Sequence, residues 1–131
     1  MTFLVGYFNP HTEEASFVNC GHGDVVLVKA DQSVSHVGAV LPPLGVVASD
    51  ALDFQTHTWH LPKKMARMYV FTDGILEATA NGKELGLQGV SALAKAVVRL
   101  PIDQALPKIM GLFQQGRLIT TDDATMMMVG E

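Results

Sequence analysis

The chain has few basic residues, and this scarcity limits the partners that it can bind. Only 9 of its 131 residues are Lys or Arg, against 13 Asp or Glu, which gives a formal net charge of −4. A protein that follows a nucleic-acid backbone needs a dense stripe of positive charge to neutralise the phosphates. The basic residues are instead scattered along the sequence. Nucleic acid is therefore not an expected partner.

Cysteine and long apolar runs are scarce as well. Cys20 is the single cysteine, so no internal disulfide can form, and a small buried side chain is its expected state. No stretch approaches the roughly 18 consecutive apolar residues that cross a bilayer. The first six residues lack the basic region of a secretory signal. With 48% hydrophobic and 17% charged residues, the sequence indicates a single cytoplasmic domain over residues 1–131, without a membrane segment.

Apolar runs predict about six strands in the first part of the chain. Polar or proline-containing turns separate these runs, as at residues 9–14 and 62–64. Pro42 and Pro43 exclude regular structure from the stretch around them, because proline lacks an amide donor and restricts the residue before it. The expected strands cover residues 2–8, 15–19, 25–29, 34–37, 53–61 and 68–72.

The apolar period then changes from two to about 3.6 residues. One helix is predicted around 90–98 and a second around 102–113, after Pro101 and with Pro107 in its first turns. Gly116 provides a C-terminal stop, and a final strand is expected at 125–129. Strands followed by two helices and one more strand indicate an α+β fold, with sheet against sheet and the helices outside.

Two acidic loops favour a cation site. Residues 71–74 (Phe-Thr-Asp-Gly) close one apolar strand, and residues 121–125 (Thr-Asp-Asp-Ala-Thr) open another. If these strands are antiparallel neighbours, the carboxylates of Asp73, Asp122 and Asp123 can meet at one sheet edge. Clustered carboxylates repel one another unless a hard divalent ion compensates them. Two simpler interpretations stay open, namely an Asp-Gly turn at 73–74 and a solvated acidic loop at 122–123.

Six short motifs occur in order along almost the whole chain: GYFNP at 6–10, FVNCGH at 17–22, PLGV at 43–46, YVFTDGILEA at 69–78, NGKELG at 81–86 and DDAT at 122–125. Each motif alone is weakly specific, whereas the set at these spacings is specific. With these motifs the chain resembles the carboxyl-terminal half of a bacterial metal-dependent serine/threonine protein phosphatase of the PPM (PP2C-like) superfamily, in its sporulation and stress-regulator branch.

The resemblance implies a fold, site residues and a cofactor. The fold is an antiparallel β-sandwich with outer helices, of which this chain would be an incomplete domain. Asp73 and Asp122 correspond to metal-ligating aspartates, while Asp123 and Gly74 stand beside them without ligating. The implied cofactor is a two-metal site of Mn²⁺ or Mg²⁺, which suits oxygen-only ligands. A metal-activated water would hydrolyse a phosphoserine, with no catalytic residue beyond the metal ligands.

The resemblance also implies a phosphorylated anti-sigma factor antagonist as substrate and an upstream receiver or sensor domain as controller. In the family, however, another metal-bridging aspartate comes from a Gly-Asp motif in an amino-terminal region, which residues 1–131 do not supply. The closest candidate, Gly23 and Asp24, stands in the wrong place in the order. The chain is therefore expected to be the carboxyl-terminal part of a longer phosphatase, with little or no activity alone. A non-catalytic, phosphatase-like binding module is the alternative, and exposed strand edges predict a homodimer.

Residues 77–89 form a short segment between the first acidic loop and the helices. In the resemblance, this segment connects the metal site to regulatory input. Glu77, Gly82 and Gly86 belong to it, and its glycines give it conformational freedom. We expect it to move Asp73 between competent and incompetent positions. Glu77 itself is explained as a helix-start glutamate that the helix dipole favours.

Three other features have structural interpretations. A ring nitrogen of His22 is expected to tie a turn. His57 and His60 would point to opposite faces of a strand, so a shared ion is not expected. Residues 126–128, all methionine, are expected to fill the core between two apolar layers.

Overall fold

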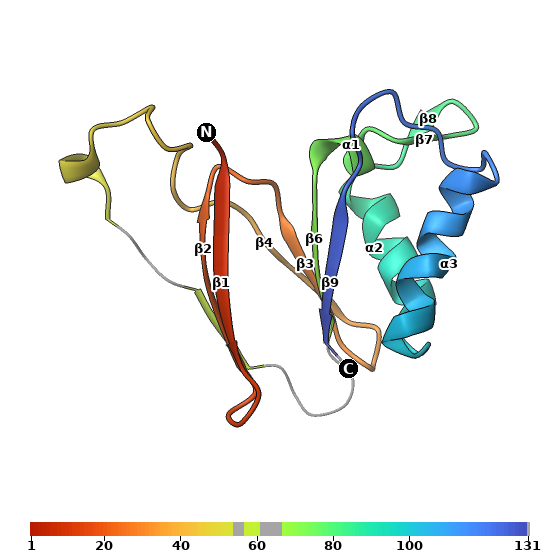
Figure 1. Ribbon diagram of the computed structural model, residues 1–131, viewed down its shortest axis with the longest axis horizontal. Coiled ribbons are helices and arrows are strands. Elements are labelled where there is room, and N and C mark those ends of the chain that lie inside the picture. Colours follow the sequence, from red (N-terminus) through yellow and green to blue (C-terminus); the bar gives the residue numbers. More distant parts are fainter. Residues whose placement is uncertain (54–56, 61–66, 131) are drawn as a thin grey trace.

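The computed structural model describes residues 1–53, 57–60 and 67–130 (Figure 1). Nine strands, three α-helices and one 3₁₀ turn follow one another in these residues. In chain order they are β1 (Phe3–Asn9), β2 (Glu14–Cys20), β3 (Val25–Val28), β4 (Val34–Val37), η1 (Ser49–Ala51), β5 (His57–His60), β6 (Arg67–Phe71), α1 (Asp73–Leu76), β7 (Thr79–Ala80), β8 (Lys83–Glu84), α2 (Gly86–Val97), α3 (Ile102–Gln114) and β9 (Met126–Gly130).

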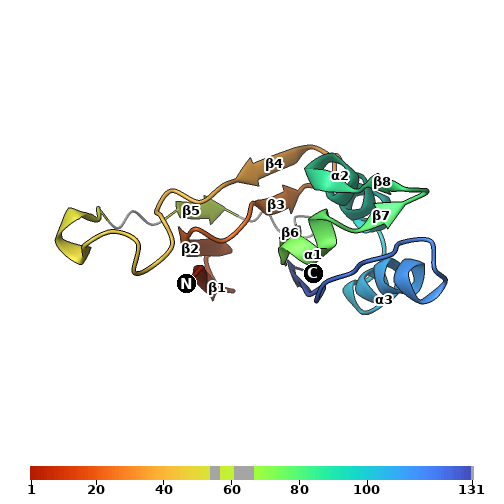
Figure 2. The same ribbon diagram turned by 90° about the horizontal axis from the view of Figure 1, so that it is seen from above.

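The strands form two larger antiparallel sheets and one small hairpin. The first sheet has the order β1-β2-β5, the second has the order β4-β3-β6-β9, and β7 pairs with β8. Figures 1 and 2 show the two larger sheets side by side, with α2 and α3 on the far face of the second sheet. Two antiparallel sheets with helices outside confirm the predicted α+β architecture.

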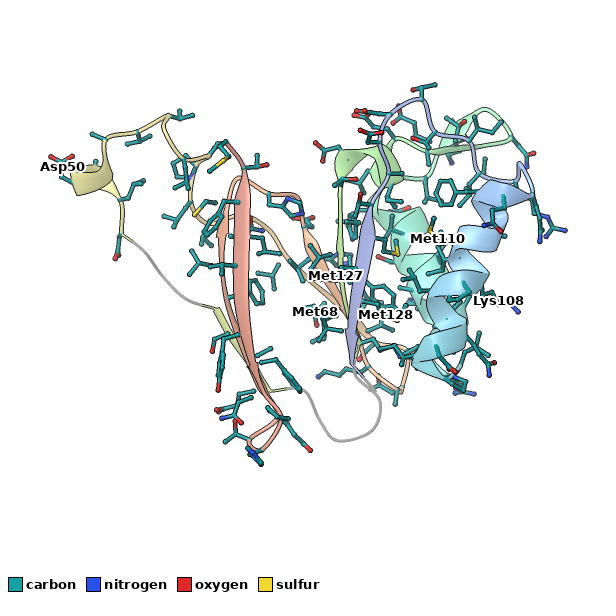
Figure 3. All side chains as sticks on the ribbon, viewed as in Figure 1. Asp50, Met68, Lys108, Met110, Met127 and Met128 are labelled. Atoms are coloured by element: carbon teal, nitrogen blue, oxygen red, sulfur yellow. The ribbon has the colours of Figure 1, made fainter. Side chains whose placement is uncertain are left out.

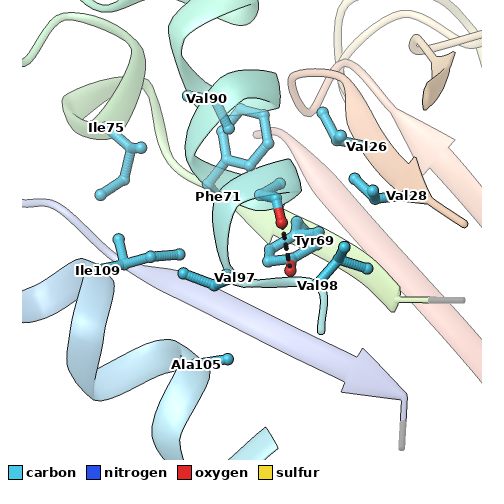
Figure 4. Packing of buried hydrophobic residues seen from close by; sticks show 11 residues of the cluster. Val26, Val28, Tyr69, Phe71, Ile75, Val90, Val97, Val98, Ala105 and Ile109 are labelled. Carbon is cyan, nitrogen blue, oxygen red and sulfur yellow. Dashed lines mark hydrogen bonds between the residues drawn. The ribbon is translucent and has the colours of Figure 1, made fainter. Parts of the chain in front are cut away.

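The main core lies between the second sheet and the two long helices (Figure 4). Along β6, Tyr69 and Phe71 point to this core, as the two-residue period of a strand requires. The apolar faces of α2 and α3 meet them through Val90, Val97 and Ile109. The Tyr69 hydroxyl donates to the carbonyl of Ala94 at 3.4 Å, so its polar atom is satisfied inside the core.

The opposite face of the second sheet meets the first sheet less completely. Ala15, Leu27 and Met68 form a small cluster there. A cavity of about 140 Å³ lies beside it, lined by residues of β1, β2, β6 and β9, including Phe17, Val70 and Met127. Figure 3 shows Met68 and Met127 on the side of β9 that faces the first sheet, and Met128 on the helix side. Residues 126–128 of β9 therefore do lie between two apolar layers, as predicted, but the packing toward the first sheet is loose.

A buried arginine joins the second sheet to the end of α2. Arg67 is only 3% exposed, and its guanidinium donates to the carbonyls of Val97 (2.8 Å) and Leu100. Val97 is the last residue of α2, and its carbonyl also accepts the amide of Leu100 at 3.0 Å, three residues past the helix. A cation is also favoured at this end by the helix dipole.

The predicted elements largely coincide with the observed ones. The expected strand at 53–61 is described only at 57–60, and its remaining residues, like the predicted turn at 62–64, lie outside the described residues apart from residue 53. Pro101 is the N-cap of α3, and the helix ends before Gly116, whose φ of 70° fits a C-terminal stop. Pro107 is the sixth residue of α3, beyond the four amides that lack partners. α1, β7 and β8 were not predicted.

No helix within the described residues combines the length and apolar character that crossing a bilayer requires.

Candidate functional site

The two acidic loops meet at one end of the second sheet. β6 and β9 pair antiparallel, with Phe71 opposite Met126 as the last pair toward the loops. The pairing continues past the strands, because the amide of Thr72 donates to the carbonyl of Thr125 at 3.0 Å. The prediction that these strands are antiparallel neighbours is confirmed. Figure 1 shows the result at the top of the view, where α1 and the loop before β9 lie next to each other.

Asp73 begins the four-residue helix α1, and burial of the next residues fixes the backbone around it. Gly74 and Ile75 are buried, and Ile75 belongs to the main core. The amide of Ile75 donates to the carbonyl of Thr72 at 2.9 Å. The Asp73 side chain, by contrast, is exposed. A carboxylate that is exposed beside a hydrogen-bonded, partly buried backbone is suited to binding a cation from solvent.

The turn after β2 also reaches Asp73. A Cβ atom at Gly23 would lie 3.7 Å from Oδ1 of Asp73. The fully buried side chain of Asn19 shapes this turn, because its Oδ1 accepts the amide of His22 at 3.0 Å and its Nδ2 donates to the carbonyl of Gly23 at 3.1 Å. A turn 50 residues earlier in the chain thus lies beside Asp73, which the sequence did not predict.

Hydrogen bonds among its own polar groups hold the loop that carries Asp122 and Asp123. Oδ1 of Asp122 accepts the amide of Asp123 at 2.7 Å. The hydroxyl of Thr120 accepts the amide of Asp122 at 3.3 Å, and it lies 2.9 Å from the carbonyl of Asp122 and 3.1 Å from that of Gly74. Both aspartate side chains are exposed.

Gly74 permits the close approach of the two loops. A Cβ atom at this position would lie 2.4 Å from the carbonyl oxygen of Asp123, which is a clash with backbone. On the other side of Asp73, the Thr72 hydroxyl donates to the same carbonyl at 3.2 Å and accepts the amide of Thr125 at 3.0 Å. Gly74 and Asp123 therefore make contact through the backbone, beside the two predicted ligands.

The expected meeting of three carboxylates is wrong for the described residues. Within residues 1–53, 57–60 and 67–130, no group of three or more His, Cys, Asp or Glu side chains is placed to hold a metal ion. One reason is visible in the second loop, where Oδ1 of Asp122 is directed to the amide of Asp123. The site therefore offers Asp73 and Asp122 from two adjoining loops. This donor set fits Mg²⁺ or Mn²⁺, since such ions take one or two carboxylates together with waters and phosphate oxygens.

The predicted regulatory segment contains a tight hairpin. Asn81 and Gly82 form its two-residue loop with φ of 52° and 75°, the positive values of a type I′ turn. Gly86, with φ of 59°, begins α2. Thr79 exchanges backbone hydrogen bonds with Ile119 at 2.8 and 3.0 Å, so the hairpin is also attached to the chain just before the second acidic loop. Glu77 is the C-cap of α1, so its interpretation as a helix-start residue is wrong.

The histidine and cysteine predictions have mixed outcomes. Cys20 is buried and unpaired, as expected. The turn containing His22 is held by Asn19, and the buried Nε2 of His22 has no hydrogen-bond partner among the described residues, so the prediction that its ring ties the turn is wrong. His57 and His60 lie on β5.

Sequence reasoning missed Thr72, Thr120 and Asn19. The partners of the two threonine hydroxyls include residues 46 and 51 positions away in the chain. One signal was present, since Thr72 directly precedes Asp73 and Thr120 stands two residues before Asp122.

A family model matches almost the whole chain. Residues 1–130 match the model of the stage II sporulation protein E (SpoIIE) family. No curated protein sequence matches the chain significantly.

Solved structures with the same fold come from three bacteria. The RsbU and RsbW domains of a Mycobacterium tuberculosis protein match 97% of this chain with 23% identity and a TM-score of 0.75. The SiaA PP2C domain of Pseudomonas aeruginosa matches 97% with 18% identity and a TM-score of 0.72. The Mn-presoaked phosphatase domain of SpoIIE from Bacillus subtilis matches 98% with 18% identity and a TM-score of 0.69. The chain spans 35%, 50% and 55% of these three chains, respectively.

Proposed function

The chain belongs to the stage II sporulation protein E (SpoIIE) family, and from this membership and its adjoining acidic loops we propose that it forms part of a metal-dependent serine/threonine phosphatase site. The observation that carries the proposal is the junction of β6 and β9, which brings the loops of Asp73 and Asp122 together. Asp73 and Asp122 would hold Mn²⁺ or Mg²⁺.

Each residue of the junction has a defined role in this proposal. Asp73 and Asp122 offer exposed oxygen ligands. Asp123 contributes its carbonyl, which fixes the second loop against Thr72, and Gly74 leaves room for that carbonyl. When bound, the metal supplies an activated water and positive charge for a phosphate group. The exposure of both carboxylates leaves them accessible to a phosphorylated side chain on another protein.

The substrate and controller follow from the family resemblance. We propose a phosphorylated regulatory protein, such as an anti-sigma factor antagonist, as the substrate and an upstream receiver or sensor domain as the controller. The SiaA and SpoIIE structures contain about as much polypeptide again outside the matched region, and the Mycobacterium tuberculosis structure contains more. Because two carboxylates complete only part of a two-metal site, further ligands would come from outside residues 1–131, and this chain alone would have little activity.

The proposed metal site can be tested on this chain without an activity assay. Mn²⁺ broadens the NMR signals of nearby amides, even when it binds weakly. We expect selective broadening at residues 72–74 and 120–125 in the wild type, and at least a tenfold higher Mn²⁺ concentration for the same broadening in Asp73→Asn. Asp103→Asn, which removes an exposed carboxylate in the first turn of α3, is the matched control.

The outcomes separate the site from non-specific binding. Equal broadening around Asp73 and Asp103 would reject the metal site and would favour a non-catalytic binding module. Selective broadening that Asp73→Asn removes and Asp103→Asn leaves intact would support it. Phosphopeptide hydrolysis should then be measured on the chain and on the Asp73→Asn variant, with weak or no turnover expected in the isolated chain.

We also propose that residues 77–89 regulate the position of Asp73. The rigidifying substitution Gly82→Pro is unsuitable as a test of this regulatory role. Proline fixes φ near −65°, whereas Gly82 has a φ of 75°. Gly82→Ala strains the turn without removing an amide donor. A change in the Mn²⁺ concentration needed for broadening at residues 72–74 is expected, and an unchanged value in a folded variant would contradict the regulatory role.

A further inference from the structure

We propose that Thr72 and Thr120 are positioning residues that use their hydroxyl groups to hold the two predicted metal ligands in a fixed relation. This inference rests on the proposed metal site, since it concerns how Asp73 and Asp122 are placed. Neither threonine is assigned as a ligand. The argument depends on the hydrogen bonds that each hydroxyl makes between the loops.

Thr72 connects the first loop to the second at three points. Its amide donates to the carbonyl of Thr125 at 3.0 Å. Its hydroxyl accepts the amide of Thr125 at 3.0 Å and donates to the carbonyl of Asp123 at 3.2 Å. The side chain thus uses both its donor and an acceptor site, which only a hydroxyl residue can do at this size. Thr72 is the residue directly before Asp73, so these bonds fix the backbone at that ligand.

Thr120 connects the loops in the opposite direction. Its hydroxyl accepts the amide of Asp122 at 3.3 Å, which holds the backbone of the second ligand. The hydroxyl lies 3.1 Å from the carbonyl of Gly74 and 2.9 Å from that of Asp122. One hydroxyl has one proton, so it donates to one of these carbonyls at a time. Donation to Gly74 links Asp122 to the residue directly after Asp73.

The two hydroxyls therefore bond to the backbone on the neighbouring residues of both aspartates. Thr72 precedes Asp73 in the chain, and its hydroxyl bonds to the carbonyl of Asp123. Thr120 stands two residues before Asp122, and its hydroxyl lies within hydrogen-bond distance of the carbonyl of Gly74. Because Asp73 and Asp122 are exposed, little side-chain packing is available to fix them. Groups that orient metal ligands from behind commonly change metal affinity by about 10- to 100-fold when they are removed. A similar effect is expected for these hydroxyls.

The test removes each hydroxyl and then restores it. Thr72→Val and Thr120→Val keep the branched shape but lose the hydrogen bonds, whereas Thr72→Ser and Thr120→Ser keep the hydroxyl. Thr121→Val is the matched control, because Thr121 is exposed in the same loop and makes no side-chain hydrogen bond within the described residues. The probe is Mn²⁺ alone, added to the ¹⁵N-labelled protein while the broadening of amide signals is followed.

The expected result is a tenfold or greater loss of apparent Mn²⁺ affinity in each valine variant. The serine variants and Thr121→Val should stay within about threefold of the wild type, which is well inside the tenfold effect. Wild-type Mn²⁺ affinity in both folded valine variants would overturn the proposal. If one valine variant fails to fold, as seen from the signals of α2 and α3, the other variant decides.

A second measurement needs no metal. The amides of Thr125 and Asp122 donate to the hydroxyls of Thr72 and Thr120, so hydrogen exchange at these amides should be faster in Thr72→Val and Thr120→Val, respectively. If wild-type protein shows no local Mn²⁺ broadening, the proposed metal site fails. Exchange rates that the valine substitutions leave unchanged would instead overturn the positioning role, so the two failures can be told apart.

Discussion

The two faces of the second sheet differ sharply in how well they are covered. On the helix side, Tyr69 and Phe71 are at most 2% exposed, and α2 and α3 close the core. On the other side, the first sheet leaves a cavity, and its edge strand β1 exposes Tyr7 (68%) and Val5 (50%). Natural edge strands are usually protected by charged residues, proline or bulges. β1 has no charged residue and pairs with β2 without a bulge over seven residues.

This difference indicates which part of the chain contributes most of its stability. Burial of apolar area drives folding. The layer formed by the second sheet and the helices should therefore account for most of the free energy of unfolding. The first sheet should depend on backbone pairing with fewer buried side chains. The site occupies the end of the well-covered layer, where Ile75 anchors α1 in the core.

The two tyrosines provide the largest expected contrast. Tyr69→Ala removes a fully buried ring and should lower the free energy of unfolding by about 3–5 kcal/mol. Tyr7→Ala removes an exposed ring and should change it by less than about 1 kcal/mol. Urea unfolding of both variants measures the difference. Similar losses in both would show that β1 is covered in solution, which would break the comparison.

Loss of the buried arginine should rank next. Arg67→Met leaves the carbonyls of Val97 and Leu100 without this donor at the end of α2, so a destabilisation of roughly 2–4 kcal/mol is expected. Arg99→Met, which replaces an exposed arginine two residues past the end of α2, is the matched control. A loss of equal size in Arg99→Met would contradict the role assigned to Arg67.

The buried Tyr69 should also make the stability of the chain depend on pH at alkaline values. Burial raises the pKa of Tyr69 above its ordinary value, while the charge of Arg67 acts in the opposite direction. The folded protein keeps this proton where the unfolded chain has released it, so stability should fall as the pH rises above about 10. Tyr69→Phe should weaken this alkaline loss of stability. Urea unfolding between pH 8 and pH 11 measures this pH dependence of the free energy of unfolding. An alkaline loss that Tyr69→Phe leaves unchanged would contradict its assignment to Tyr69.

The smallest effect on stability is expected at the open edge. Val5→Lys places a charge on exposed β1 and should change the free energy of unfolding by less than about 0.5 kcal/mol. The predicted homodimer should weaken, however, because charges on edge strands oppose edge-to-edge pairing. Sedimentation at two concentrations would show it, with Val46→Lys in the exposed loop as control. A wild type that is monomeric at both concentrations would reject self-association.

Much of the fold followed from local patterns. Strands β1 to β4 and β6 carry apolar runs separated by turn residues, and α2 and α3 carry a regular apolar period. α1 escaped prediction because four residues are too few to show a period. The β7–β8 hairpin also escaped, although Asn81 and Gly82 are a strong signal for a two-residue turn. From the sequence, we expected only conformational freedom at these residues.

The site was predictable in its backbone but not in its side-chain contacts. The loops of Asp73 and Asp122 were expected to meet because pairing of antiparallel strands fixes which ends adjoin. The orientation of Asp122 toward the amide of Asp123 depends on the local path of the loop, which spacing does not define. The buried Asn19 and the hydroxyl of Thr72 act across long sequence separations, so their roles required the three-dimensional structure.

The backbone bridge between Thr79 and Ile119 gives the β7–β8 hairpin a double attachment. On one side the hairpin continues from α1, which begins with Asp73, and on the other it is bonded to the residue before Thr120. The two predicted ligands are thus connected through one short hairpin, whose tip at Asn81 is exposed. This connection consists of backbone hydrogen bonds and does not pass through the larger sheets.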